Sequence, residues 1–490
     1  MTDTFARDRL PPREAWPDLL LLDGPPRVNA AVELLRHEGT AIARGWSYAE
    51  LRSRAEAVAA TLRIESGTRV LLHTPNTAEA VAAWLGILLA GGIVVATMPL
   101  LRAGEIAKVV DKAQPAVALA PRALAAEVVA GGVARVLALE DLPAQGSFEP
   151  VDTAADDVAI IAFTSGTTGP PKGCVHFHRD LLATCDTFAR HVLEPSPEDV
   201  FSGTPPLAFT YGLGGLVLFP LRFGAAIAPV ARPGDMLAAI GELGITTLFT
   251  APTAYRAMLG QEVPTSLRTC VSAGEPLPAA VSDAWFAQTG IRIVDGIGST
   301  EMLHIFIGSP AASARAGSCG RPVPGYEARI VDDDMKPLGV GEVGRLAVRG
   351  PTGCRYLDDP RQSVYVRDGW NLTGDAFSVD ADGYFWFQAR TDDMIISSGY
   401  NISGFEVEAA LLGHPLVAEC AVVAAPDEQR GHVVMAYVVT SGEVSAGELQ
   451  DHVKATIAPY KYPRRIEFVD ALPRTPTGKV QRNVLRERSR

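Results

Sequence analysis

Hydroxyl groups, glycines and one lysine gather in residues 164–173, directly after the apolar run 158–163. That run has the length and composition of a buried strand, so the glycine-rich loop is expected at a strand end. Glycine allows the backbone to approach an anion closely, and serine and threonine add hydrogen-bond donors. The pattern therefore predicts a phosphate-binding loop, whose candidate contacts are Thr164, Ser165, Gly166, Thr167, Thr168 and Lys172.

This loop differs from the common P-loop. That motif has four residues between its glycines, followed by Gly-Lys-Ser/Thr. Here Pro170 and Pro171 precede Lys172, and Gly173 follows it. The prolines remove two amide donors, and no hydroxyl follows the lysine to hold magnesium. A glycine-rich surface turn is the alternative interpretation, but the length of the match and the preceding strand favour phosphate binding.

An acidic pair, Thr300 and Glu301, and a lone lysine, Lys479, lie far along the chain from this loop. A reaction at crowded phosphates needs charge neutralisation and alignment of the reacting groups. Together with the loop, these residues predict a site that consumes ATP to form an adenylate. A carboxylate substrate is already an anion near neutral pH, so it can attack phosphorus without a general base.

Composition narrows the classes of protein. A chain of 490 residues exceeds the size of one hydrophobic core, so at least two domains are expected. The net charge of −12 argues against a nucleic-acid partner. The six cysteines show no paired spacing and the first residues form no apolar signal segment, which predicts a cytoplasmic protein. The basic residues after Lys454 are either a solvated tail or a contact for a phosphorylated cosubstrate.

Alternating apolar segments predict an α/β body. The uncharged stretch 81–101 could mimic a transmembrane helix, but Gly91 and Gly92 divide it into a helix capped by Asn76 and a buried strand at 93–98. No membrane partner is therefore expected. Further strands are expected at residues 67–73, 246–249 and 291–294, the last leading into a loop at 296–298.

The fold class expected is α/β. We expect a large N-terminal body of several subdomains, including a small β-rich one at residues 325–350. After Arg390 the pattern becomes a compact α+β unit, which we expect to be mobile. The chain is therefore divided into an N-terminal domain, 1–391, and a small C-terminal domain, 392–490. Cys174, His176 and His178 share one face of a strand and could mimic a metal site, although core cysteines and histidines are common.

The chain resembles the adenylate-forming acyl-CoA synthetase superfamily over essentially its whole length. The motifs that carry the resemblance occur in the family's order, at residues 164–173, 296–301, 373–375, 390–393 and 473–479. Residues 208–214 and 299–306 look like the branch of benzoate and 2-aminobenzoate CoA ligases. Residues 399–404 lean toward the 2-aminobenzoate type.

The resemblance implies an AMP-forming acid–thiol ligase that joins an aryl acid to coenzyme A through an aryl-adenylate. ATP, Mg²⁺ and coenzyme A are the implied cofactors, and the molecule is expected to be a monomer or homodimer. Alternatively, the adenylate is passed to an acyl-carrier protein or to another nucleophile. A noncatalytic sensor of aryl acids is disfavoured because Lys479, Glu301 and Asp375 are retained.

The family's site residues fall on matching positions of this sequence. The implied catalytic residues are Lys479, Glu301 and Thr300, with Glu301 as the magnesium ligand. The implied ATP contacts beyond the loop are Gly274, Glu275, Pro276, Asp295, Gly296, Ile297, Asp375 and Arg390. The implied aryl slot is formed by Tyr211, Ala273, Gly274, Gly296, Gly298, His304 and Ile305. The implied hinge and CoA-facing residues are Asp392, Ser398, Gly399 and Tyr400.

A tyrosine or histidine that simply fills the core is the other interpretation of Tyr211 and His304. Asp375 or Arg390 could instead be one end of a surface ion pair. Lys479 and Asp392 could be solvated side chains.

Overall fold

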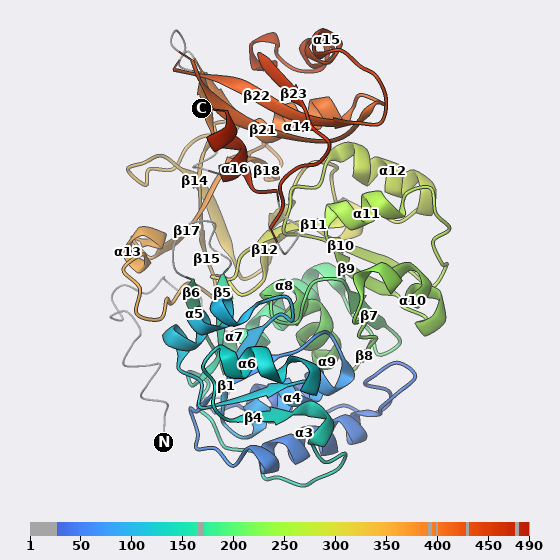
Figure 1. Cartoon of the computed structure of the whole chain (residues 1–490), viewed down its shortest axis with the longest axis vertical. Helices are drawn as coiled ribbons and strands as arrows, with labels where there is room; N and C mark the ends of the chain where they lie inside the picture. Colours follow the sequence, from blue (N-terminus) through green and yellow to red (C-terminus); the bar gives the residue numbers. More distant parts are fainter. Residues whose placement is uncertain are drawn as a thin grey trace.

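The computed structural model describes residues 27–164, 171–390, 394–397, 400–427, 431–475 and 480–489. Figure 1 shows a large body of helices and sheets, with the C-terminal elements gathered at one end of the molecule. In the described part of the chain, no helix is both long and apolar enough to cross a bilayer. The expected α/β class with a distinct C-terminal unit is confirmed, and the mobility of that unit stays a prediction.

The glycine-rich loop connects the last two strands of the first sheet, β5 and β6. The strand order of this sheet is β4-β3-β1-β2-β5-β6, with β6 antiparallel to β5 and the other neighbours parallel. Parallel strands covered on both faces need continuous apolar runs, which this sequence supplies. The strands are β1 Arg69–His73, β2 Ile93–Thr97, β3 Val117–Ala120, β4 Val136–Ala138, β5 Val158–Thr164 and β6 Lys172–Phe177.

Helix α4 (Ala78–Leu89) follows β1 and is buried along almost its whole length. Thr77 caps this helix, so the expectation that Asn76 would do so is wrong. The Asn76 amide donates to the Pro205 carbonyl at 3.0 Å, and its oxygen accepts from the Leu207 amide at 2.8 Å. Asn76 therefore ties the first sheet to a distant loop. The other helices of this region are α2 Ala30–Leu34, α3 Tyr48–Leu62, α5 Ala103–Ala113, α6 Ala125–Ala130 and α7 His178–Thr184.

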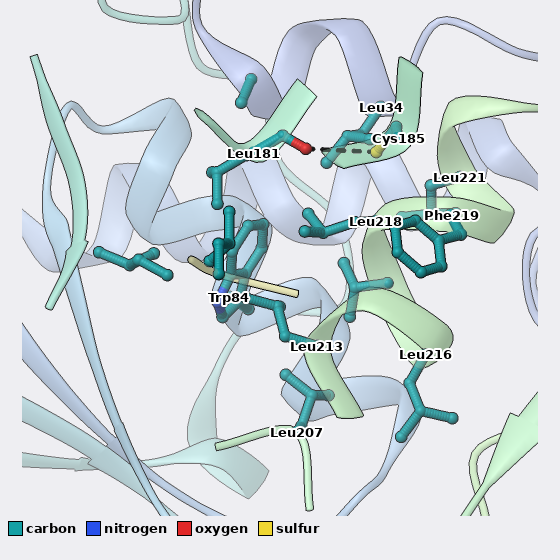
Figure 2. Close-up of a cluster of buried hydrophobic side chains, with 14 of the residues drawn as sticks. Leu34, Trp84, Leu181, Cys185, Leu207, Leu213, Leu216, Leu218, Phe219 and Leu221 are labelled. Carbon is teal, nitrogen blue, oxygen red and sulfur yellow. Dashed lines mark hydrogen bonds between the residues drawn. The ribbon is translucent and has the colours of Figure 1, made fainter. Parts of the chain in front are cut away.

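Trp84 of α4 packs in the core against side chains from the segment that follows Pro206 (Figure 2). That segment contains α8 (Thr210–Leu213), a π-helical turn (Gly214–Leu218) and α9 (Phe219–Arg222). Burying each large apolar side chain contributes roughly 1.5–3 kcal/mol. This packing fixes α8, which carries the candidate acid-binding residue Tyr211.

The second sheet has the order β13-β12-β11-β10-β9-β7-β8. The expected loop at 296–298 is wrong, because those residues belong to strand β11 (Val294–Gly298), which pairs antiparallel with β12 (Ile305–Gly308). Helices α10, α11 and α12 lie beside this sheet (Figure 1). The remaining elements are β7 Val200–Gly203, β8 Ala226–Ile227, β9 Thr247–Thr250, β10 Thr269–Ser272, β13 Arg321–Pro322, α10 Met236–Leu243, α11 Pro252–Met258 and α12 Ala279–Thr289.

The β-rich region extends beyond the expected residues 325–350. Strands β14, β15, β17 and β16 form one sheet in that order, and β18 pairs with β17. Strand β17 pairs antiparallel with β15, β16 and β18 along its ten residues. The elements are β14 Glu327–Val331, β15 Gly344–Arg349, α13 Gln362–Tyr365, β16 Val366–Arg367, β17 Trp370–Val379 and β18 Phe385–Arg390.

Several described contacts join the C-terminal unit to the body, among them an edge-on packing of Phe405 against Phe387 with ring centroids 5.7 Å apart. Ser403, which caps α14, also donates to the Gln388 carbonyl on β18, and Arg256 donates to the Ala418 carbonyl at 2.9 Å. The elements of this unit are β19 Ile395–Ser397, β20 Tyr400–Ile402, α14 Gly404–Leu412, β21 Val417–Asp427, β22 Gly431–Thr440, α15 Ala446–Thr456, β23 Arg465–Phe468 and α16 Arg482–Arg488.

Candidate active site

The lysine of the glycine-rich loop and the acidic pair lie together, as the sequence predicts. Glu301 lies in the turn between β11 and β12, and its side chain is mostly buried. Lys172 Nζ is 4.0 Å from Glu301 Oε1. The Tyr356 hydroxyl lies between them: it accepts from Lys172 at 3.1 Å and donates to Glu301 at 2.6 Å. Burial and the nearby Glu301 carboxylate raise the pKa of Tyr356 far above its usual value, so the phenol stays protonated.

Thr164 pairs with Lys172 across β5 and β6 and begins the loop. Among the described residues, no hydrogen bond reaches its buried hydroxyl oxygen. A buried hydroxyl without a partner is costly, and a phosphate or a hydrated cation would satisfy it. Glu301 and this hydroxyl supply the hard oxygen atoms that Mg²⁺ prefers. The described residues contain no cluster of three or more His, Cys, Asp or Glu side chains suited to a metal.

The two candidate ribose contacts bind each other. Asp375 and Arg390 lie opposite one another on β17 and β18, and Arg390 Nη1 donates to Asp375 Oδ1 at 2.8 Å. Burial raises the pKa of Asp375, and the Arg390 guanidinium opposes that rise. The two residues therefore form an ion pair in which Asp375 is mostly buried and half of the Arg390 side chain is exposed. Their contact with a ribose stays a prediction.

The candidate adenine wall follows the ends of two parallel strands. Ser272 at the end of β10 lies beside Asp295 on β11, and the chain turns at Gly274, whose φ of 88° favours glycine. Glu275 and Pro276 follow in the same turn. Desolvation raises the pKa of Asp295 to about 8. A neutral carboxyl at this strand end can both donate and accept hydrogen bonds.

Asp295→Asn should make the free energy of unfolding less dependent on pH. The pKa of Asp295 rises from 3.8 to about 8 on folding, so the folded state binds an extra proton between these values. The stabilisation of the folded state by this group is greatest below pH 4 and is lost as the pH rises to 8. Each pH unit over which the folded state holds one extra proton is worth about 1.4 kcal/mol, so between pH 5 and 8 the variant should gain on the order of 4 kcal/mol in unfolding free energy relative to the natural protein. Thermal unfolding across this range measures it, and parallel curves for the two proteins would contradict it.

The candidate aryl slot is bounded by aromatic rings. The Tyr211 hydroxyl lies 2.9 Å from the Val271 carbonyl, to which it donates, and its ring centroid is 5.7 Å from that of His304. His304 is also within 6.3 Å of Phe188, Phe219 and Phe249, measured between ring centroids. Desolvation lowers the pKa of His304 to about 3, so its imidazole is neutral. No hydrogen bond from a described residue reaches either ring nitrogen.

The glycines of this slot are required by strand pairing. A Cβ on Gly298 would lie 2.6 Å from the His304 carbonyl oxygen, and one on Gly296 would lie 2.7 Å from the Ile305 side chain. A side chain at Gly298 would therefore push apart β11 and β12 before it reached any ligand. Ala273 and Ile305, the other candidate slot residues, are both buried.

Two residues that no sequence motif assigned to the site contact Thr300 and Glu301. Tyr356 belongs to no motif, and no periodic pattern marks it. His176 was considered as a metal ligand, but its Nε2 donates to the Thr300 carbonyl at 2.7 Å. His178 Nδ1 accepts from the Ala30 amide at 3.1 Å, and Cys174 bridges to Tyr356 through the backbone. His178 begins helix α7 and is not part of strand β6, so the expectation that these three residues share one strand face is wrong.

Several candidate residues lie outside the described part of the chain, and their roles stay predictions. They are Ser165, Gly166, Thr167, Thr168, Asp392, Ser398, Gly399 and Lys479. Only the backbone of Tyr400 is described, as the first residue of β20.

Comparison with known proteins adds independent information. The model of the AMP-binding enzyme family matches residues 30–355, and that of the AMP-binding enzyme C-terminal domain matches residues 406–479. Benzoate–CoA ligase of Thauera aromatica is 41% identical over 377 residues, which cover 73% of this chain and 71% of that protein.

Two solved structures extend the likeness to almost the full chain. The anthranilate CoA ligase AuaEII in complex with anthranoyl-AMP is 32% identical, with a TM-score of 0.89 over 95% of this chain and 98% of that one. A benzoate CoA ligase from Burkholderia xenovorans LB400 is 33% identical, with a TM-score of 0.85 over 94% and 100%.

Proposed function

Because the chain belongs to the AMP-binding enzyme family, we propose that it is an ATP-dependent aryl acid CoA ligase. It would convert a benzoate-like or 2-aminobenzoate-like acid, ATP and coenzyme A into aryl-CoA, AMP and diphosphate. One observation carries the proposal beyond the family. The turn that holds Glu301 near Lys172 also connects Gly298, at the end of β11, to His304 and Ile305. The candidate acid slot and the candidate phosphate site therefore share one turn.

The chain's own groups would work as follows. Lys172 and Thr164 would bind phosphate oxygens, and the acid would lie between Tyr211 and β11. The acid's carboxylate would then attack the α-phosphorus as diphosphate departs, without a general base. Mg²⁺, held by Glu301 with support from Thr300 and Thr164, would neutralise phosphate charge.

Further contacts would hold the nucleoside of ATP. Asp375 is engaged by Arg390 through Oδ1, so Oδ2 could accept from a ribose hydroxyl. The turn at Gly274, Glu275 and Pro276 would flank the adenine on one side. Asp295, Gly296 and Ile297 would flank it on the other.

The division into two domains is part of the proposal. An N-terminal domain, 1–391, would bind ATP and the acid, and a C-terminal domain, 392–490, would bring Lys479 to the phosphates. Asp392 would be the hinge, and Ser398, Gly399 and Tyr400 would face coenzyme A after the domain turns. Six unpaired cysteines support a cytoplasmic location.

Mass analysis of the products tests the proposal. The protein would be incubated with ATP, Mg²⁺ and a panel of substituted benzoates, with and without coenzyme A. We expect aryl-CoA and AMP only when all substrates are present, with flat aryl acids preferred to long-chain acids. Turnover that does not need coenzyme A would instead support transfer of the adenylate to a carrier protein or another nucleophile, and would contradict the ligase proposal.

A further inference from the structure

Thr300 and Glu301 in the acidic turn are each held by a group from another part of the chain. The backbone carbonyl of Thr300 accepts from His176 Nε2 at 2.7 Å. The carboxylate of Glu301 accepts from the Tyr356 hydroxyl at 2.6 Å. The turn between β11 and β12 is therefore fixed by its surroundings as well as by its own backbone.

The same pattern holds at both ends of the turn. The Ser299 hydroxyl lies 3.3 Å from the Tyr365 hydroxyl, and the Met302 carbonyl accepts from the Thr352 hydroxyl at 2.8 Å. Three of the four partners, all except His176, come from residues 352–365. We call this segment the supporting segment.

Tyr356 is itself rigidly placed within the supporting segment. Its side chain is fully buried, and its backbone amide donates to the Gln362 side chain at 2.9 Å. Its ring packs edge-on against Tyr365, with the centroids 5.8 Å apart. A phenol held in this way keeps its oxygen at one point, so the carboxylate that accepts from it is also held.

The orientation of the Tyr356 hydroxyl follows from its two partners. Lysine can only donate and an ionised carboxylate can only accept, so the phenol accepts from Lys172 and donates to Glu301. This engages Glu301 Oε1. Among the described residues no hydrogen bond reaches Oε2, which remains available to a cation. A hydrogen bond to a charged acceptor is stronger than one between neutral groups.

We propose that Tyr356 is a positioning residue that fixes the Glu301 carboxylate, with Oε1 engaged and Oε2 presented to the divalent cation of the nucleotide. This inference rests on the proposed function for the reaction concerned. The contact between the phenol and the carboxylate does not depend on which acid or acceptor is used. Tyr356 does not itself touch the reacting atoms.

Tyr356→Phe removes one oxygen atom and tests the proposal directly. Mn²⁺ replaces Mg²⁺ as the probe, and electron paramagnetic resonance measures its binding in the presence of a non-hydrolysable ATP analogue. We expect the affinity for Mn²⁺ to fall about tenfold, as expected on loss of one hydrogen bond to a charged group. The KM for Mg²⁺ in adenylate formation should rise by a similar factor. Thioester formation from a synthetic aryl-adenylate should change less than twofold.

Tyr48→Phe is the matched control. Tyr48 is also fully buried, and its hydroxyl donates to the Ala225 carbonyl at 2.8 Å, in the first part of the chain. Both variants should lose thermal stability, but Tyr48→Phe should bind Mn²⁺ as the natural protein does. Equal Mn²⁺ affinity in Tyr356→Phe and Tyr48→Phe would show that Tyr356 only fills space, and would overturn the proposal.

A second variant covers the case in which Tyr356→Phe does not fold. Placing 4-aminophenylalanine at position 356 keeps the ring and restores a donor in place of the hydroxyl. It should recover Mn²⁺ affinity to within about twofold, and a folded protein that still binds Mn²⁺ tenfold more weakly would overturn the proposal. If the natural protein formed no aryl-CoA, the proposed function would fail, yet the Mn²⁺ measurements would still decide the role of Tyr356.

Discussion

Glu301→Gln should slow adenylate formation by about 100-fold or more, the scale expected when one preorganised electrostatic group is lost from a reaction centre. Glutamine has the shape of glutamate, and its amide oxygen can still accept from the Tyr356 hydroxyl, which lies 2.6 Å from Oε1 in the natural protein. The fold should therefore survive. The negative charge beside the phosphates is lost, and with it the ability to hold a divalent cation.

Exchange of diphosphate into ATP, driven by an aryl acid, measures this step. Glu327→Gln is the matched control, because Glu327 is half-exposed on β14 and pairs with Arg349 at 2.8 Å, in the β-rich sheet. It makes the same change of charge and should leave exchange within about twofold. Thioester formation from a synthetic aryl-adenylate should also survive in Glu301→Gln. An exchange rate in Glu301→Gln close to that of the control would rule out Glu301 as a group of the reaction centre.

Asp180→Ala should destabilise the body by about 3–5 kcal/mol, because it leaves a buried arginine without its carboxylate. Asp180 Oδ2 lies 2.7 Å from Arg355 Nη1, and both side chains are fully buried. The same oxygen accepts from the Phe177 amide at 3.0 Å at the start of α7. Burial alone would raise the pKa of Asp180, but Arg355 and other nearby cationic groups hold it well below its usual value of 3.8.

Urea unfolding followed by tryptophan fluorescence measures the effect, since Trp84 on α4 belongs to the same hydrophobic core as Leu181 on α7. A folded-state pKa below 3.8 means that the pair stabilises fully above that pH and loses its effect as the pH falls below it. The difference between Asp180→Ala and the natural protein should therefore shrink in acid. Asp141→Ala is the control, because Asp141 pairs with Arg122 on the exposed surface and should cost less than 1 kcal/mol. Equal losses in the two variants would contradict this account.

Local sequence patterns were sufficient for much of the fold. The apolar run before the glycine-rich loop forms β5, and the two glycines after α4 divide an apolar stretch into a helix and a strand. Both features could be predicted because the backbone conformation of a short segment depends mainly on its own residues and their neighbours. The motifs also predicted that the lysine of the glycine-rich loop and Glu301 belong to one site. Lys172 and Glu301, 129 positions apart in the sequence, lie 4.0 Å apart.

Tertiary structure alone decided which side chains hold these groups in place. Asn76 has the residue type of a helix cap, yet its amide is used by a loop about 130 residues away, and Thr77 caps the helix instead. Tyr356 and His176 reach the acidic turn across 55 and 124 residues. A hydrogen bond over such a distance leaves no periodicity in the sequence, because its geometry depends on how separate sheets pack and not on the conformation of either segment alone.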